Sequence, residues 1–441
     1  MSGLFAGAAR ASIAPRSEEL AAGVWLGGFG SYRQRRATAV HDEPQCRALA
    51  LSDGITAFVV AALDLVGASG PLLQEIRQDA ARLTGVAPEQ IIVACTHSHA
   101  SPDSQGLWGG LTPAYRDHIA HRAGAAIWEA HQALAPAVAS AVTTTLGDGL
   151  VLNRRGWPET DRTLTALRFT REDGAPVSTL INAACHPTTT GAANTEVSRD
   201  WCGYAVDAIE RETGGVAVYV NGAIGDANPA ESGGFDPAQR LGEAVAGAAL
   251  AALRDAVPIG GFLRVRAELL ELPVNAERLS ERVQSAVARA GPALSVLAKS
   301  GGMGAASLAL HAAGRGDLAQ IVAALAGISE RGLVRRDGRT CLPTLCGYLR
   351  IGDDVEALVA PGEVLTRLAL PLRAALAASH RLFLGLSHDT LGYFVPEDEW
   401  MTGRNNNYEE SVSMGKHAGA ALADGLLRLV PHGAEKAGGH A

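Results

Sequence analysis

The stretch that decides the fold spans residues 89 to 103 and reads Glu-Gln-Ile-Ile-Val-Ala-Cys-Thr-His-Ser-His-Ala-Ser-Pro-Asp. Its apolar part, Ile91 to Cys95, is β-branched at its start and predicts a buried strand. Side chains two residues apart in an extended chain point to the same side, so we expect His97 and His99 to converge where the strand opens into a loop. Polar groups at the carboxyl end of a buried strand are typical of active sites in open α/β sheets.

A second strand and a helix precede this stretch. Residues 57–65 predict a buried strand and residues 72–83 an amphipathic helix. Strand, helix and strand in succession form a βαβ unit, whose strands we expect to be parallel. Further strands are predicted at 138–146, 164–169, 177–183, 216–220, 346–351, 355–359 and 382–386, and helices at 113–134 (after Thr112 as N-cap), 199–211, 237–253, 363–376 and 413–429. The pattern predicts an α/β fold of mixed twisted β-sheets flanked by helices.

No repeat or Pro/Ser-rich linker divides the chain of 441 residues. We therefore interpret residues 1–434 as one catalytic domain and residues 435–441 as a short tail. The Ala/Leu-rich segment at about 275–330 carries few chemically reactive residues and predicts a helical insertion.

The composition of the chain limits the cellular location and the classes of binding partner that we expect. The formal charge of −8 is mild and spread along the chain, which argues against a nucleic-acid partner or a membrane held by charge. No transmembrane stretch and no apolar secretory signal are recognisable, so we expect a cytoplasmic location. The six cysteines include no C-x-x-C pair, which favours reduced core residues over disulfides or a thiolate metal site.

Further polar groups also follow predicted strands. His186 closes one strand, and residues 221–229 follow another. The two glycines of that segment could let backbone N–H groups approach a ligand, or could simply form a tight turn. Glu363 opens a predicted helix, where it could bind a metal or cap the helix. Two imidazoles, a carboxylate and a fourth oxygen suit Zn²⁺, which keeps a position for water in catalytic sites.

In order and context these motifs resemble those of the neutral/alkaline non-lysosomal ceramidases, zinc-dependent amidohydrolases that cleave the N-acyl bond of ceramide. Residues 94–102 are similar to the family's Thr-His-Thr-His-Ser-Gly-Pro stretch. Similar matches follow at Asn153-Arg154, at Cys185 to Thr188 with Ser198, Asp200, Gly203 and Tyr204, at Gly225-Asp226 with Pro229, at Pro361 to Glu363, and at Gly392-Tyr393 with Tyr408-Glu409. The resemblance covers nearly the whole chain, from His41 to Tyr408.

The resemblance implies a set of site residues. The implied zinc ligands are His97, His186, Glu363 and Tyr393. Beside the metal, the resemblance implies that His99 and Tyr408 act in proton transfer and transition-state stabilisation, and that Arg154 holds a substrate oxygen.

Two departures from the family pattern matter. Asn228 stands where the family has a serine that is proposed in some members as nucleophile or transition-state partner. A hydroxyl nucleophile is excluded there, which favours attack by metal-activated water, and Asn228 remains a candidate hydrogen-bond donor to an oxyanion. We also expect the family's C-terminal immunoglobulin-like domain to be absent, and for that reason we expect a smaller or soluble substrate.

We therefore expect a zinc-dependent hydrolase, with one zinc ion, that cleaves an amide bond of a small-molecule or lipid-like substrate. Two alternatives stay open. The same metal site could hydrolyse an ester, a lactone or a cyclic amide, or the scaffold could bind a metal or ligand without catalysis.

Overall fold

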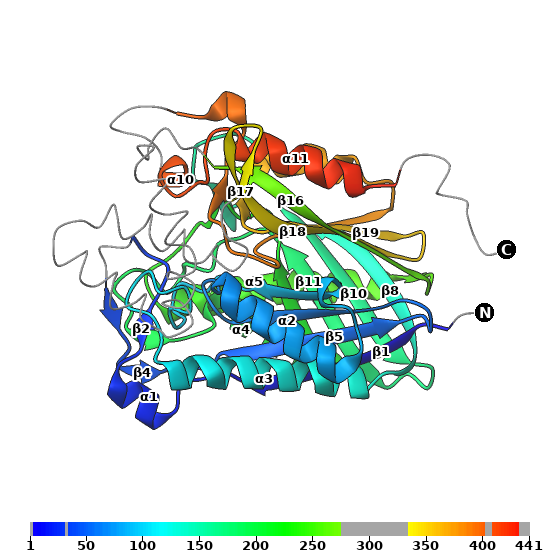
Figure 1. The fold of residues 1–441 in the computed structure, drawn as a ribbon. Coiled ribbons are helices and arrows are strands. Elements are labelled where there is room, and N and C mark those ends of the chain that lie inside the picture. Colours follow the sequence, from blue (N-terminus) through cyan, green and yellow to red (C-terminus); the bar gives the residue numbers. More distant parts are fainter. Residues whose placement is uncertain (1–2, 31–33, 275–333, 402–407, 432–441) are drawn as a thin grey trace.

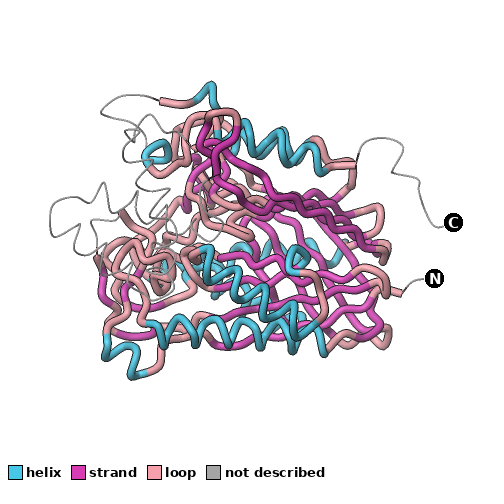
Figure 2. Tube along the Cα trace, in the orientation of Figure 1, coloured by secondary structure: helices cyan, strands magenta, loops and turns pink. Residues whose placement is uncertain are grey.

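Two β-sheets lie face to face, and helices cover both outer faces (Figures 1 and 2). The structure is a computed structural model, and it describes residues 3–30, 34–274, 334–401 and 408–431. The predicted α/β class with mixed sheets is confirmed. The helical insertion expected at about 275–330 lies outside the described residues.

The larger sheet has nine strands in the order β13-β11-β10-β8-β1-β5-β6-β7, with β15 paired to β8. β6 and β7 are parallel, as are β11 and β13, and the other pairs described in this sheet are antiparallel. The strands are β1 (Phe5–Ser12), β5 (Gln45–Ser52), β6 (Ala57–Leu63), β7 (Ile91–Cys95), β8 (Ala135–Thr145), β10 (Thr163–Arg171), β11 (Pro176–Ala183), β13 (Val216–Asn221) and β15 (Val257–Ile259).

The smaller sheet has five strands in the order β16-β18-β19-β21, with β17 paired to β18. Its strands are β16 (Leu263–Pro273), β17 (Val334–Arg336), β18 (Arg339–Ile351), β19 (Val355–Val359) and β21 (His380–Leu384). Short two-stranded pairs join β2 (Trp25–Leu26) to β3 (Arg35–Arg36), β4 (Ala39–Val40) to β12 (Glu196–Val197), β9 (Val151–Asn153) to β14 (Ala227–Pro229), and β20 (Glu363–Val364) to β22 (Tyr393–Phe394).

The predicted βαβ unit is confirmed. β6 and β7 run parallel with Val59 opposite Ile91 and Leu63 opposite Cys95, and helix α2 (Gly70–Thr84) connects them. The helix ends at Gly85, whose φ of 77° is left-handed and whose N–H donates to the carbonyl of Ala81.

Helices cover the outer face of each sheet. α2 and α3 (Pro113–Gln132) cover one part of the larger sheet, and α4 (Asp200–Thr213) and α5 (Phe235–Ala252) cover another. α9 (Thr366–Ala374) and α11 (Ala418–Leu429) pack on the smaller sheet. The predicted N-cap of α3 is confirmed, because Thr112 Oγ1 accepts a hydrogen bond from Tyr115 N at 3.3 Å. The remaining helical segments are α1 (Ser17–Ala22), α10 (Tyr408–Ser411) and single 3₁₀ turns at Pro88–Gln90, Leu253–Asp255 and Glu397–Glu399.

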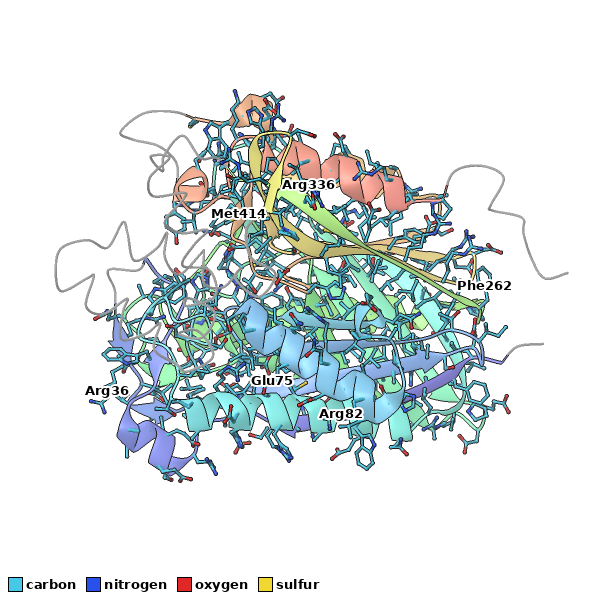
Figure 3. The ribbon with its side chains drawn as sticks, in the orientation of Figure 1. Arg36, Glu75, Arg82, Phe262, Arg336 and Met414 are labelled. Atoms are coloured by element: carbon cyan, nitrogen blue, oxygen red, sulfur yellow. The ribbon has the colours of Figure 1, made fainter. Side chains whose placement is uncertain are left out.

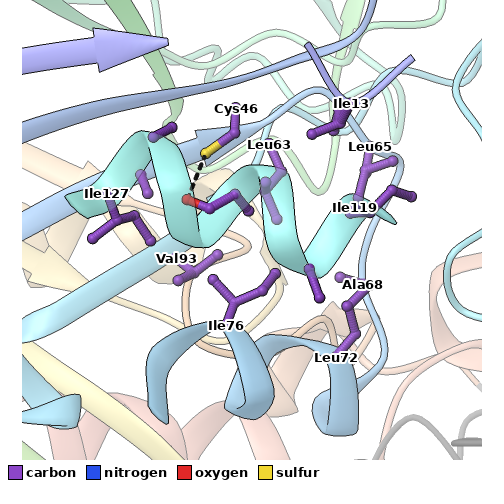
Figure 4. Close-up of a cluster of buried hydrophobic side chains, with 14 of the residues drawn as sticks. Ile13, Cys46, Leu63, Leu65, Ala68, Leu72, Ile76, Val93, Ile119 and Ile127 are labelled. Carbon is purple, nitrogen blue, oxygen red and sulfur yellow. Dashed lines mark hydrogen bonds between the residues drawn. The ribbon is translucent and has the colours of Figure 1, made fainter. Parts of the chain in front are cut away.

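Apolar side chains fill the space between these layers. Phe58, Phe169 and Leu382 belong to the core between the two sheets. Beneath α2 and α3, Ile76 and Val93 belong to a second cluster, in which Cys46 Sγ lies 3.9 Å from a carbonyl oxygen of α3 (Figure 4). All six cysteines are buried and free, as predicted.

Exposed charged side chains lie on the outside of the molecule. Charged side chains such as Arg82 on α2 and Arg336 on β17, which are 72% and 65% exposed, lie on the exterior (Figure 3). Within the described residues, none of the helices has both the length and the apolar character that a membrane span requires.

Candidate metal centre

Strands of both sheets end close together at the end of the sandwich where the loops gather (Figure 2). β7 leads into the His-x-His stretch, β11 leads to His186, and β19 leads to Glu363. The main chain joins these ends, since Cys95 N donates to the carbonyl of Leu386 at 3.0 Å. Because Cys95 ends a strand of the larger sheet and Leu386 follows a strand of the smaller one, both sheets contribute to the site.

Three buried histidines meet here. One ring nitrogen from each of His97, His99 and His186 lies within 4.8 Å of the others, and this group could hold a metal ion. The predicted convergence of His97 and His99 is confirmed, with their Nε2 atoms 3.2 Å apart. The expected reason was wrong: His97 has a left-handed φ of 69°, so the chain is not extended there.

Backbone carbonyls orient two of the imidazoles. His186 Nδ1 donates to the carbonyl of Ile224 at 2.8 Å, and His97 Nδ1 donates to the carbonyl of Val66. A carbonyl oxygen can only accept, so in the neutral rings each Nδ1 carries the proton and each Nε2 carries a lone pair. Hydrogen bonds of this kind hold metal-binding histidines in position.

Glu363 faces both of these lone pairs. Its Oε2 lies 3.1 Å from His186 Nε2 and 3.4 Å from His97 Nε2. Within the described residues this buried oxygen has no hydrogen-bond partner. Glu363 Oε2 and the two Nε2 atoms are three electron-pair donors with no proton between them, which is unfavourable when the site is empty. The same three atoms suit a divalent cation that takes nitrogen and oxygen ligands.

Burial keeps two of the imidazoles neutral. Burial lowers the pKa of His186 and of His99 below 6.5. At neutral pH the rings of His186 and His99 are therefore neutral.

Glu363 lies next to Tyr393, but in a different element of secondary structure from the one expected. Glu363 was expected at the start of a helix, but it belongs to β20, and α9 begins only at Thr366. Its N–H donates to the carbonyl of Gly392, and the parallel pairing places Glu363 beside Tyr393. Burial, and then the Glu363 carboxylate, raise the pKa of Tyr393 well above its ordinary value, so a phenolate there requires a cation close by.

His99 is enclosed by the glycine-rich loop. Phe29 meets its ring edge-on, with the ring centroids 4.8 Å apart. Gly28 lies so close that a Cβ there would come within 2.3 Å of His99 Cγ, and its φ is 109°. The Nδ1 atom of His99 is buried, and within the described residues it has no hydrogen-bond partner. His99 could therefore act as a ligand or carry a proton.

Arg154 and Tyr408 lie together beside Tyr393. The Arg154 guanidinium is 5.5 Å from the centre of the Tyr408 ring and donates to Glu409. The rings of Tyr393 and Tyr408 are 5.8 Å apart. The structure thus brings Arg154 and Tyr408 to the side of the centre that carries Tyr393.

Two charged residues of this region were not predicted. Arg155 is buried and donates to Glu410 Oε1 at 2.9 Å and to the carbonyl of Glu399 at 3.0 Å. These bonds hold the helix α10, which carries Tyr408. Adjacent arginines at 154–155 and adjacent glutamates at 409–410 were the signal available in the sequence.

The 221–229 segment agrees with the tight-turn reading. The Gly222 and Gly225 N–H groups donate to the carbonyls of Ala183 and Val364, so neither amide points to a ligand. Asn228 lies in β14 opposite Leu152 and is partly buried. Among the described residues, no hydrogen bond joins its side chain to the histidines or to Glu363.

Neither a protein-family model nor a curated protein matches the sequence. Solved structures do match. The crystal structure of neutral ceramidase from Pseudomonas aeruginosa aligns with a TM-score of 0.71 at 18% identity, over 98% of this chain and 76% of that chain. The chain has the neutral ceramidase fold. A ceramidase complexed with C2 aligns with a TM-score of 0.71 at 17% identity over the same shares of the two chains.

The comparison confirms the predicted resemblance at the level of the fold. At sequence identities of 17–18%, the structural similarity shows that the fold is shared and shows no further property of this chain. Within this ceramidase fold, the buried cluster of His97, His99 and His186 could hold a metal ion.

Proposed function

We propose that this chain is a zinc-dependent hydrolase that cleaves an amide (N-acyl) bond. The observation that carries the proposal is the buried Glu363 Oε2, which faces two imidazole Nε2 atoms within 3.4 Å and lacks a hydrogen bond in the described structure. The shared ceramidase fold supports the choice of an amide substrate.

Four side chains would hold the metal. His97 and His186 offer Nε2, Glu363 offers Oε2, and Tyr393 offers its phenol oxygen, a nitrogen and oxygen set that suits Zn²⁺. When bound, such an ion polarises a carbonyl group and lowers the pKa of a water molecule toward about 7.

The chain's own residues supply proton transfer and charge stabilisation. His99 places a neutral imidazole beside the centre, with its Nε2 3.2 Å from His97 Nε2, where it can take a proton and deliver it to the leaving amine. Arg154 and Tyr408 lie next to Tyr393 and can donate hydrogen bonds to a developing oxyanion. Asn228 remains a candidate donor to the same oxyanion.

Metal analysis and turnover of histidine variants test the site. We expect His97→Ala and His186→Ala to lose both metal and turnover, and His99→Ala to keep most of its metal while losing about 10²- to 10⁴-fold in rate. His380→Ala is a matched control, because His380 Nδ1 bonds to Thr143 Oγ1 at the start of β21, whereas the centre follows the strand ends. Full metal content and rate in His97→Ala or His186→Ala would overturn the assignment.

A substrate panel tests the reaction. It compares long-chain N-acyl amides, short soluble N-acyl amides, small cyclic amides and esters. We expect turnover of short soluble N-acyl amides without detergent. Turnover of esters alone would contradict amide specificity, and metal binding without any turnover would indicate a binding protein.

A further inference from the structure

One buried turn contacts three parts of the candidate centre, and we propose that its carboxylate, Asp226, is a positioning residue. In this proposal Asp226 holds Glu363 and Arg154 at their distances from His186. The inference rests on the proposed function, since positioning has meaning only if these residues act together. Asp226 is fully buried.

The Asp226 carboxylate bonds to two separate segments. Its Oδ1 accepts from Thr366 N at 2.8 Å and from Thr366 Oγ1 at 2.7 Å. Thr366 follows Glu363 by three residues. The other oxygen, Oδ2, accepts from Asn153 Nδ2 at 2.8 Å, and the Asp226 carbonyl accepts from Arg154 N at 2.7 Å. We call these two sets of hydrogen bonds the two arms of Asp226. The Thr366 arm leads to Glu363, and the Asn153 arm leads to Arg154.

The same turn also holds His186. The carbonyl of Ile224 accepts from His186 Nδ1 at 2.8 Å, and the carbonyl of Ala227 accepts from His186 N at 2.8 Å. These two residues flank Gly225 and Asp226. The imidazole is therefore fixed to the turn at two points, and the Asp226 side chain relates it to Glu363 and Arg154.

Gly225 allows the turn to approach Glu363. Its N–H donates to the carbonyl of Val364 at 3.0 Å. A Cβ at Gly225 would meet Glu363 O at 2.7 Å and Leu365 Cδ1 at 2.8 Å, so a side chain there would push β20 away. The turn and β20 therefore lie in direct contact.

Only a carboxylate completes both arms. An asparagine at 226 keeps one oxygen acceptor for Thr366 but turns its NH₂ group toward Asn153 Nδ2, so that two donors face each other. Within the described part of the chain, no arginine, lysine or histidine forms an ion pair with Asp226. Hydrogen bonds alone therefore stabilise the charge of Asp226. Losing the bonds to either Thr366 or Asn153 removes stabilisation that no ion pair replaces.

The experiment measures zinc affinity, by competition with a chelator, and kcat and KM for the best amide substrate. We expect Asp226→Asn to weaken zinc binding by about 10- to 100-fold and to lower kcat/KM as well. The control is Glu356→Gln, which alters another buried carboxylate with three donors, namely Tyr348 Oη, Ala377 N and Ala378 N. The control should leave both quantities within about twofold.

Single-arm variants separate the two roles. Thr366→Val removes one hydroxyl at constant shape, and we expect it to weaken zinc affinity because it loosens Glu363. Asn153→Ala acts on the Arg154 side, so it should lower kcat/KM about tenfold with zinc affinity within about twofold. These variants also carry the test if Asp226→Asn fails to fold.

The results of these experiments distinguish a failure of the positioning role from a failure of the proposed function. If the Asp226 and Thr366 variants match Glu356→Gln in zinc affinity while the wild type binds zinc, the positioning role is wrong and the proposed function stands. If Thr366→Val and Asn153→Ala change both quantities equally, Asp226 does not act through separate arms. A wild type without zinc or hydrolysis overturns the proposed function, and the positioning role falls with it.

Discussion

Replacing Glu363 with glutamine should stabilise the metal-free chain and weaken its stabilisation by metal. In the structure Glu363 Oε2 is buried without a hydrogen bond, 3.1 Å from the lone pair on His186 Nε2. The amide nitrogen of glutamine can donate to that lone pair. A buried acceptor without a partner costs about 1–3 kcal/mol, so we expect a gain of about this size in the free energy of unfolding.

The metal-loaded chain should respond in the opposite direction. At a metal concentration about 1,000 times Kd, binding to the folded state adds about 4.1 kcal/mol to the wild type. Loss of a charged ligand that weakens binding about 100-fold reduces this to about 1.4 kcal/mol. The variant is therefore expected to be more stable than the wild type without metal, and to gain about 2.7 kcal/mol less from metal.

Urea unfolding at pH 8, with a chelator or with excess zinc, measures both effects. Glu356→Gln is again the matched control, because its carboxylate accepts three hydrogen bonds and should lose stability equally with and without zinc. The reasoning is refuted if Glu363→Gln destabilises the metal-free chain as the control does. It is also refuted if zinc stabilises the variant as much as the wild type.

Three further predictions concern other parts of the chain. Protons compete with metal for Nε2, and burial lowers the pKa of His186 below 6.5, so a steep loss of zinc affinity through protonation of this ring, measured by chelator competition, should begin only below pH 6.5; a steep loss already between pH 8 and pH 7 would contradict this. Thr112→Ala removes the N-cap of α3 and should lower the free energy of unfolding by about 1 kcal/mol, whereas Thr112→Ser should retain most of it. Ala357 lines a cavity of about 30 Å³ between the sheets, so Ala357→Val should raise the free energy of unfolding by up to about 0.7 kcal/mol, and a loss in urea unfolding would show overpacking instead.

Much of the architecture could be predicted because it depends on local pattern. The apolar run of β7, the βαβ unit and the Thr112 cap each follow from residues adjacent in sequence. The convergence of His97 and His186 could also be anticipated, because both follow buried strands and such strand ends share an edge.

Features that depend on distant partners could not be predicted in this way. Glu363 lies in a two-residue strand only because Tyr393 and Phe394, some thirty residues later, pair with it, whereas the local sequence favours a helix start. The left-handed φ of His97 has no sequence signal, since such a conformation is uncommon for histidine. The burial of Arg155 against Glu410 likewise depends on a loop and the helix α10, which meet only in the folded chain.

The two imidazoles that face Glu363 are oriented by the peptide carbonyls of Val66 and Ile224. Every amino acid carries that carbonyl, so no point substitution can delete either acceptor. Substitutions at positions 66 and 224 can therefore alter the packing around the His97 and His186 rings, while the proton of each ring stays on Nδ1. Redesign of this centre for another ion would have to replace the imidazoles themselves or reshape the main chain that aims them.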